Sequence, residues 1–364
     1  SPLRRHLEVA YPPVFFFLGS GIHSALATYY EHNINPVTAF KLWYWWRMRQ
    51  YGLNGIVLSA ERKQEYAEQA KLGVGMLKHY RRTYPSDKER FELVLAESRF
   101  NVPIRTLSGR KSGHYYASGI FDGVIVDSQG LYWLLEHKTY KSVRGEQQFE
   151  LSDQAKMYVY AAQEQYGLPV QGILYNILRK NIPTVPRELA RGGISKNKSI
   201  DTTYATYLQT IKDFGYEPSD YAEILGLLSD RGNTFFYRFP IRKSPKEMDV
   251  FKRLLYITAR EMGKPGRDLI PSNDDWTCRM CWFREPCIME QMGEHSAAED
   301  WLSINTRKRI MRADTQFHYY VVRTDYQQWK AMTKEERALS QKAVAAPSAQ
   351  FNIVVKEPAT QETT

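Results

Sequence analysis

The chain has 364 residues, 43% of them hydrophobic, and is long enough to bury one large core or one core plus an accessory module. Its formal net charge of +10 favours a polyanion such as nucleic acid, although a merely soluble basic protein would show the same excess. The strongest apolar run, residues 14–18, is far shorter than the roughly 20 residues of a membrane span, and the polar, basic start is unlike a signal peptide. We therefore expect a cytoplasmic protein without a membrane partner. Because Ser1 is not an initiator Met, the chain could begin inside a longer protein.

Helical spacing of apolar residues dominates the N-terminal part of the chain. It predicts helices over residues 21–30, 36–50 and 61–84. The pattern then changes to that of strands, which are predicted over residues 91–102, 115–126 and 131–139. The short polar turn Asp127-Ser128-Gln129-Gly130 joins the last two strands and predicts a hairpin.

Helices and strands alternate through the rest of the main body. Helices are predicted over residues 151–166, 203–214, 220–229 and 245–262, and strands over residues 170–178 and 234–240. Residues 181–199 are rich in Pro, Gly and Lys and predict a long basic loop with a function. The order of elements predicts an α/β fold. We expect a main domain over residues 1–293 that includes a cysteine module at 271–293, a basic extension at 294–339 and a disordered tail at 340–364.

The hairpin turn decides which side chains meet. A three-residue loop, with Gly130 in the left-handed conformation, would pair Asp127 with Leu131 and set Asp122 opposite Glu136. A four-residue loop would instead shift the register by one residue and put the carboxylate of residue 122 on the wrong face.

Side chains alternate along a strand, so Glu136 and Lys138 share the face that Asp122 joins, while His137 points to the other side. Two carboxylates this close repel unless a cation lies between them, which predicts a hard ion such as Mg²⁺ or Mn²⁺ and a lysine that directs the attacking water. The alternative is an ordinary hairpin with surface charges. The apolar run at residues 131–135 argues against it, because it predicts a central strand covered on both faces.

Four motifs follow one another in the chain: Gly19-x-x-x-His23, Phe121-Asp122-Gly123, Glu136-His137-Lys138 and Gln154-x-x-x-Tyr158. In this order they resemble the PD-(D/E)XK nuclease superfamily, especially its RecB-like exonucleases from bacterial repair complexes, phages and CRISPR adaptation systems. The resemblance covers about the first 290 residues. It implies a restriction-endonuclease-like mixed sheet flanked by helices, with the site at one edge, in a bacterial or phage-infected cell.

The resemblance also implies a set of metal ligands. His23 and the backbone carbonyl of His137 would join the carboxylates of Asp122 and Glu136. A histidine that is simply hydrogen-bonded on an apolar helix is the alternative for His23. Glu97 is a further acidic candidate, or else a charge on an edge strand.

The fourth motif places Gln154 and Tyr158 four residues apart, on one face of the predicted helix. In the family this pair supports the catalytic lysine, here Lys138, and approaches DNA phosphate. The alternative is a surface helix with an aromatic residue packed inward.

All three cysteines, Cys278, Cys281 and Cys287, lie close together with a spacing that suits a metal or cluster in a reducing cytoplasm. They resemble the C-terminal half of the family's four-cysteine [4Fe-4S] site, whose remaining cysteine lies where Ser1 stands here. Ser1 could replace that cysteine, the fourth ligand could precede residue 1, or no cluster assembles. Zinc with His295 is the runner-up, and three buried cysteines without a metal are the last alternative.

Six basic residues follow the strands or frame the long loop and are candidates to hold a phosphate backbone: Lys141, Arg144, Arg179, Lys180, Lys196 and Lys198. The resemblance implies hydrolysis of DNA at ends or in single strands, with a helicase or recombination partner. A catalytically inactive DNA-binding or scaffold subunit of the same fold is the alternative, as is a structural zinc or iron-sulfur module.

Overall fold

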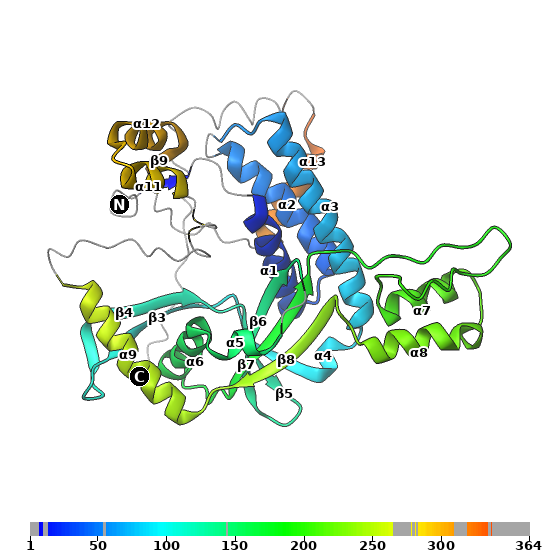
Figure 1. The fold of residues 1–364 in the computed structure, drawn as a ribbon, viewed down its shortest axis with the longest axis horizontal. Helices are drawn as coiled ribbons and strands as arrows, with labels where there is room; N and C mark the ends of the chain where they lie inside the picture. The colour runs from blue at the N-terminus through cyan, green and yellow to red at the C-terminus, as the bar shows by residue number, and fades with distance from the viewer. Residues whose placement is uncertain are drawn as a thin grey trace, which may run out of the picture.

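A computed structural model describes residues 7–9, 14–53, 56–142, 145–264, 278, 281, 283–308, 319–333 and 336. Its centre is a mixed sheet of five strands in an α/β fold, so the predicted fold class is confirmed (Figure 1). None of the described helices is long and apolar enough to cross a membrane.

The central sheet carries the hairpin in its middle. Its strands lie in the order β2 (Phe91–Ala96), β5 (Gly123–Asp127), β6 (Tyr132–Tyr140), β7 (Gly172–Arg179) and β8 (Phe236–Arg242). Only β6 and β7 run parallel, and the other neighbours are antiparallel. A parallel pair needs a crossover, which α5 (Gln147–Glu150) and α6 (Asp153–Tyr166) supply.

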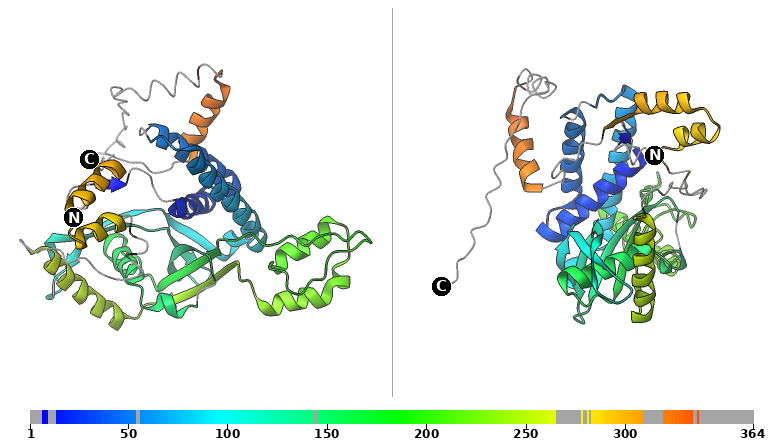
Figure 2. Two further views of the ribbon diagram at one scale, coloured as in Figure 1. Left: turned by 45° about the horizontal axis from the view of Figure 1, so that its top comes forward. Right: turned by 90° about the vertical axis from the view of Figure 1, so that its left-hand side faces the viewer.

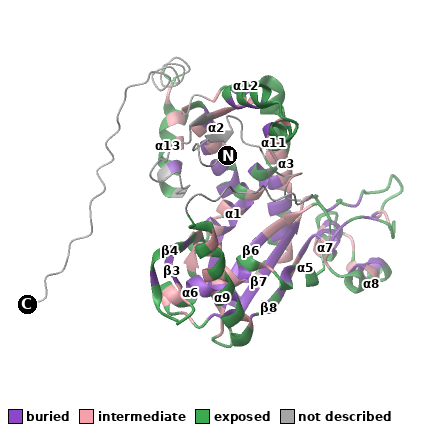
Figure 3. Ribbon diagram, turned by 60° about the vertical axis from the view of Figure 1, so that its left-hand side comes forward, coloured by how far each residue is buried: buried purple, intermediate pink, exposed green. Residues whose placement is uncertain are grey.

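Helices cover both faces of this sheet, as the apolar run of β6 predicts. Trp133 and Leu135 face a core shared with α1 (Val14–His32), α2 (Pro36–Leu53) and α3 (Ala60–Thr83), which lie on one side. Leu134 faces a second core shared with α6 and α9 (Pro245–Met262) on the other side. Figure 3 shows the buried strands between these layers.

Two of the predicted strands are wrong in one respect, because each is broken where a single strand was expected. Residues 91–102 form β2 and then part of β3 (Arg99–Arg105), and residues 115–126 form part of β4 (Lys111–Ile120) and then β5. The strands β3 and β4 pair with each other in a separate sheet. At the bend, Glu97 has a φ of 37° and donates its backbone N–H to the carbonyl of Asp122 over 3.1 Å. The sequence carries a sign of this bend, because the polar residues 97–99 interrupt the alternation and the buried apolar positions then change from odd to even numbers.

The long loop and the helices after it form a lobe of their own. It comprises α7 (Tyr204–Asp213), η1 (Pro218–Tyr221) and α8 (Ala222–Arg231), which share a small core with Ile194 and Ile200 of the loop region. The lobe projects from the sheet in Figures 1 and 2. Its link to the main body includes a hydrogen bond of 2.8 Å between His79 of α3 and Thr206 of α7. The predicted loop at 181–199 is confirmed; within it Glu188 and Ile194 form an isolated bridge.

The C-terminal elements return to the N-terminal ones. The short helix α4 (Asp87–Arg90) precedes β2. After α9, the described chain continues with α11 (Arg284–Gln291), α12 (His295–Asn305) and β9 (Thr306–Lys308). Strand β9 pairs with β1 (Leu7–Val9), and α13 (Tyr319–Ala331) packs against α2. The domain boundaries at 293 and 339 stay predictions, and the tail at 340–364 lies outside the described residues.

Candidate active site

The turn between β5 and β6 has the predicted form. Gly130 has a φ of 75°, its N–H donates to the carbonyl of Asp127 over 2.9 Å, and Asp127 N–H donates to the carbonyl of Leu131 over 3.0 Å. The register then places Gly123 opposite Leu135. Asp122, one residue before β5, is thereby brought to the level of Glu136 in β6.

Both carboxylate oxygens of Asp122 have partners. The His23 ring in α1 contacts Oδ1 through Nδ1 at 3.0 Å, and the backbone N–H of His137 donates to Oδ2 over 2.8 Å. The N–H of His137 meets a side chain rather than a strand because β5 begins only at Gly123. Asp122 therefore links helix α1 to strand β6.

Glu136 is the most deeply buried acidic group of the site, with 4% of its surface exposed. One oxygen, Oε1, lies 2.6 Å from Nζ of Lys138. The other, Oε2, is buried and has no hydrogen-bond partner among the described residues. A buried carboxylate oxygen without a partner is costly, so this oxygen fits a ligand that supplies positive charge.

The pKa values of the two carboxyl groups differ widely. Burial and the charge of Asp122 raise the pKa of Glu136 to about 7. Burial opposes ionisation of Asp122 too, but the charge and hydrogen bond of His23 outweigh it and hold the pKa of Asp122 at about 2. For His23, burial is outweighed by the charge and hydrogen bond of Asp122, which raise its pKa. When two carboxylates share a site, the charge of one opposes ionisation of the other, so that one pKa is raised.

The predicted helix pair meets the lysine. Nζ of Lys138 donates to Oε1 of Gln154 over 2.9 Å, and Nε2 of Gln154 donates to the hydroxyl of Tyr158 over 2.9 Å. Burial, together with the charge of Glu136, raises the pKa of Tyr158 to about 12. A continuous chain of polar contacts therefore runs from Glu136 through Lys138 to helix α6.

The side chain of His137 points away from Glu136 and Lys138, as predicted, and enters a buried polar network. Its Nδ1 accepts from Asn176 over 2.8 Å, and Oδ1 of Asn176 accepts from Nε of Arg238 over 3.0 Å. Arg238 also donates to both oxygens of Asp87. Burial lowers the pKa of His137 to about 3, so the ring is neutral. Asp87, Asn176 and Arg238 were not predicted from the sequence, because polar and charged residues far apart in a chain are ordinarily exposed.

Among the described residues, no three His, Cys, Asp or Glu side chains form a group arranged to hold a metal ion. Mg²⁺ does not require such a group, since it binds one or two carboxylates and keeps several waters. The partnerless oxygen of Glu136 beside Asp122 is compatible with that mode. Glu97, the other acidic candidate, is half-buried at the bend next to Asp122.

Cys287 lies within α11, and Cys278 and Cys281 precede that helix. Cys281 is exposed, Cys278 and Cys287 are half-buried, and Nε2 of Gln291 lies 3.7 Å from Sγ of Cys287. His295, the candidate zinc ligand, contacts Glu290 at 3.0 Å. The iron-sulfur and zinc interpretations stay predictions, because residues 1–6 and most of 265–282 lie outside the described residues.

The six basic candidates fall into separate places, and Arg144 lies outside the described residues. Lys141 and Lys180 follow the ends of β6 and β7 and are close enough for the charge of Lys141 to add to burial in lowering the pKa of Lys180. The other three already have partners. Arg179 pairs with Asp201, Lys196 donates to the carbonyl of Asp220, and Lys198 pairs with Glu223. The structure therefore does not gather the five described candidates into one groove.

A mixed sheet flanked by helices, with two carboxylates and a lysine on neighbouring backbone segments, has the restriction-endonuclease-like arrangement. The sequence model of the PD-(D/E)XK nuclease superfamily matches residues 5–288. The chain therefore belongs to the PD-(D/E)XK nuclease superfamily, whose nucleases generally use Mg²⁺ or Mn²⁺. No curated protein matches the chain.

Proposed function

We propose that this chain is a Mg²⁺- or Mn²⁺-dependent deoxyribonuclease that hydrolyses phosphodiester bonds, and that it acts as a RecB-like exonuclease on DNA ends or single strands. The observation that carries the proposal is the buried, partnerless Oε2 of Glu136 beside a second carboxylate. Its place in an E-x-K strand within a nuclease family supports a catalytic use over a structural one.

Asp122 and Glu136 would hold the cation, with His23 and the backbone carbonyl of His137 as further ligands. The N–H and C=O of one strand residue point to the same side, and the N–H of His137 donates to Asp122. The carbonyl of His137 therefore belongs on the same side, where β5 has ended. When bound, the cation would polarise a phosphoryl oxygen and lower the pKa of an attacking water.

Side chains near the carboxylates would orient the attacking water and the phosphate. Lys138, held between Glu136 and Gln154, places its ammonium group where it can orient a water and offset negative charge on the phosphate. Gln154 keeps that ammonium group in position, and Tyr158 fixes Gln154. Of the five described basic candidates, Lys141 and Lys180 are the best placed to contact a DNA backbone, because both follow the ends of the parallel strands β6 and β7, next to the site.

The motif order also supports a place in recombination, repair or phage replication, with a helicase or recombination protein as partner. Digestion of end-labelled linear DNA and of closed circular single strands tests the exonuclease assignment. We expect Mg²⁺-dependent loss of the terminal label and intact circles. Linearised circles would show an endonuclease, and intact substrates with both metals would favour an inactive DNA-binding subunit.

A further inference from the structure

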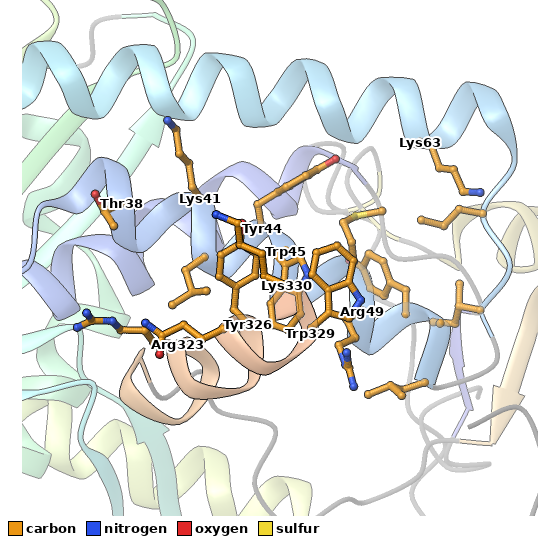
Figure 4. Close-up of a pocket in the computed structure, with 18 of the residues that line it drawn as sticks. Thr38, Lys41, Tyr44, Trp45, Arg49, Lys63, Arg323, Tyr326, Trp329 and Lys330 are labelled. Atoms are coloured by element: carbon orange, nitrogen blue, oxygen red, sulfur yellow. The ribbon is translucent and has the colours of Figure 1, made fainter. Parts of the chain in front are cut away.

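A large cleft lies between α2 and α13, separate from the carboxylates. Its volume is about 1160 Å³, and Figure 4 shows the side chains that line it. Helix α1 connects the two places. Its Gly21 packs against α2 so closely that an added Cβ would lie 2.6 Å from the Phe40 ring, while His23, two residues on, contacts Asp122.

Aromatic rings form the middle of the cleft. Trp45 of α2 packs against Tyr326 and Trp329 of α13, with ring centroids 5.1 and 5.8 Å apart. The Tyr326 and Trp329 rings lie within 20° of parallel. All three side chains are half-buried and face the cleft. Rings held in this way offer flat surfaces on which planar groups can stack.

Positive charge surrounds these rings. Five basic side chains line the cleft, and its described lining includes no Asp or Glu; the five are Lys41, Arg49, Lys63, Arg323 and Lys330. Figure 4 shows Lys63 at one end and Arg323 at the other, with the aromatic rings between them. Within the described part of the chain, neither of these two forms an ion pair. The guanidinium of Arg49 lies 5.5 Å from the centre of the Trp45 ring.

We propose that this cleft binds single-stranded DNA, with bases stacked on the aromatic rings and phosphates held by the basic side chains. Aromatic platforms within a positive groove are the two features that single-strand binding combines. Paired bases inside a duplex keep their faces stacked on one another, so a duplex cannot use the rings in this way.

The size of the cleft favours a strand over a small molecule. Pockets for drug-sized ligands have volumes of about 300–1,000 Å³, and this cleft exceeds that range. Its lining runs along α2 from Thr38 to Leu53, a distance of about 22 Å at 1.5 Å per residue. That length matches about six stacked nucleotides at 3.4 Å each. This inference rests on the proposed function in one respect, which is the choice of DNA as the bound polymer.

Binding of a fluorescein-labelled oligo(dT) by the full chain in EDTA tests the cleft separately from cleavage. The variant Lys63→Ala/Arg323→Ala removes two phosphate contacts at opposite ends without touching the core. Its matched control is Lys212→Ala/Lys246→Ala, which removes two exposed charges on α7 and α9. Trp329→Ala tests stacking, with circular dichroism to show that it folds.

We expect the slope of log affinity against log salt, which is negative, to become shallower by about 1.4 in the cleft double variant, at about 0.7 for each phosphate contact to a single strand. The control should keep the wild-type slope. Trp329→Ala should weaken binding about 5- to 150-fold. Wild-type binding by the cleft double variant would overturn the proposal, as would equal competition by a blunt duplex. Loss of cleavage in Glu136→Gln with normal oligo(dT) binding would separate this site from the nuclease site.

Discussion

The ammonium group of Lys138 lies 2.6 Å from one carboxylate oxygen of Glu136, while the other oxygen of that carboxylate is buried without a hydrogen-bond partner among the described residues. One side of the carboxylate is thus neutralised by the chain itself. The other side is left for an external positive charge, which is the basis of the predictions that follow.

Added Mg²⁺ should stabilise the protein more above pH 7 than below it. The pKa of Glu136 is raised to about 7, so without a cation its contribution to stability is fully present below its ordinary pKa and is lost as the pH rises through about 7. A bound cation reverses this loss, because it requires the ionised carboxylate. At a concentration of about one hundred times Kd the gain is about 2.7 kcal/mol, which thermal unfolding at two pH values would detect.

Glu136→Gln should abolish both the Mg²⁺-induced rise in Tm and its pH dependence. The exposed Glu217 offers a matched control, and Glu217→Gln should behave as wild type. An undiminished rise in Tm for Glu136→Gln would place the ion elsewhere.

His23→Ala should weaken metal activation. His23 contacts the carboxylate of Asp122 at 3.0 Å, and loss of a group that orients or supplements metal ligands typically costs about 10- to 100-fold in metal affinity or activity. The Mg²⁺ concentration for half-maximal cleavage should rise by that factor. His114→Ala changes an exposed histidine on β4 and should leave the Mg²⁺ response unaltered. The same response in both variants would remove His23 from the site.

Gln154→Ala should lower the cleavage rate without unfolding the chain. Gln154 is exposed and links Lys138 to Tyr158 through two hydrogen bonds of 2.9 Å. Among the described residues, its loss leaves Glu136 as the contact of the ammonium group, so we expect a fall of about tenfold at saturating DNA. Gln163→Ala, an exposed position on the same helix, is the control. Equal rates for the two variants would reduce Gln154 to an ordinary surface residue.

Arg238→Ala should be strongly destabilising. It would leave the fully buried carboxylate of Asp87 without its cation, a change that typically costs about 3–5 kcal/mol. Arg179→Ala breaks the more exposed pair with Asp201 and should cost less than about 1 kcal/mol. Urea unfolding would measure both values. A small loss for Arg238→Ala would mean that water reaches Asp87 in the folded protein.

The hairpin could be predicted from the sequence because it depends on local chemistry. Gly130 fixes the turn, and the turn fixes the register of Asp122 and Glu136. The spacing of Gln154 and Tyr158 was likewise sufficient to place both on one face of α6. These features need only nearby residues and the period of the secondary structure.

Features that depend on distant residues were not predictable. The polar residues 97–99 mark a break in the alternation, but they do not show that the strands beyond the break pair with each other outside the main sheet. Arg238 meets Asp87 across 151 residues of sequence. The basic composition of the loop did not indicate that Lys198 would pair with Glu223 of the neighbouring helix.

Cleavage of labelled DNA by Lys138→Ala and Glu136→Gln, in Mg²⁺ and under single-turnover conditions, tests the central claim most directly. Lys212→Ala, an exposed lysine of the α7–α8 lobe, is the control for loss of positive charge. Both site variants should cut at least about a hundredfold more slowly than wild type, while the control cuts normally. Wild-type cutting by either site variant would contradict the assignment of that residue to catalysis.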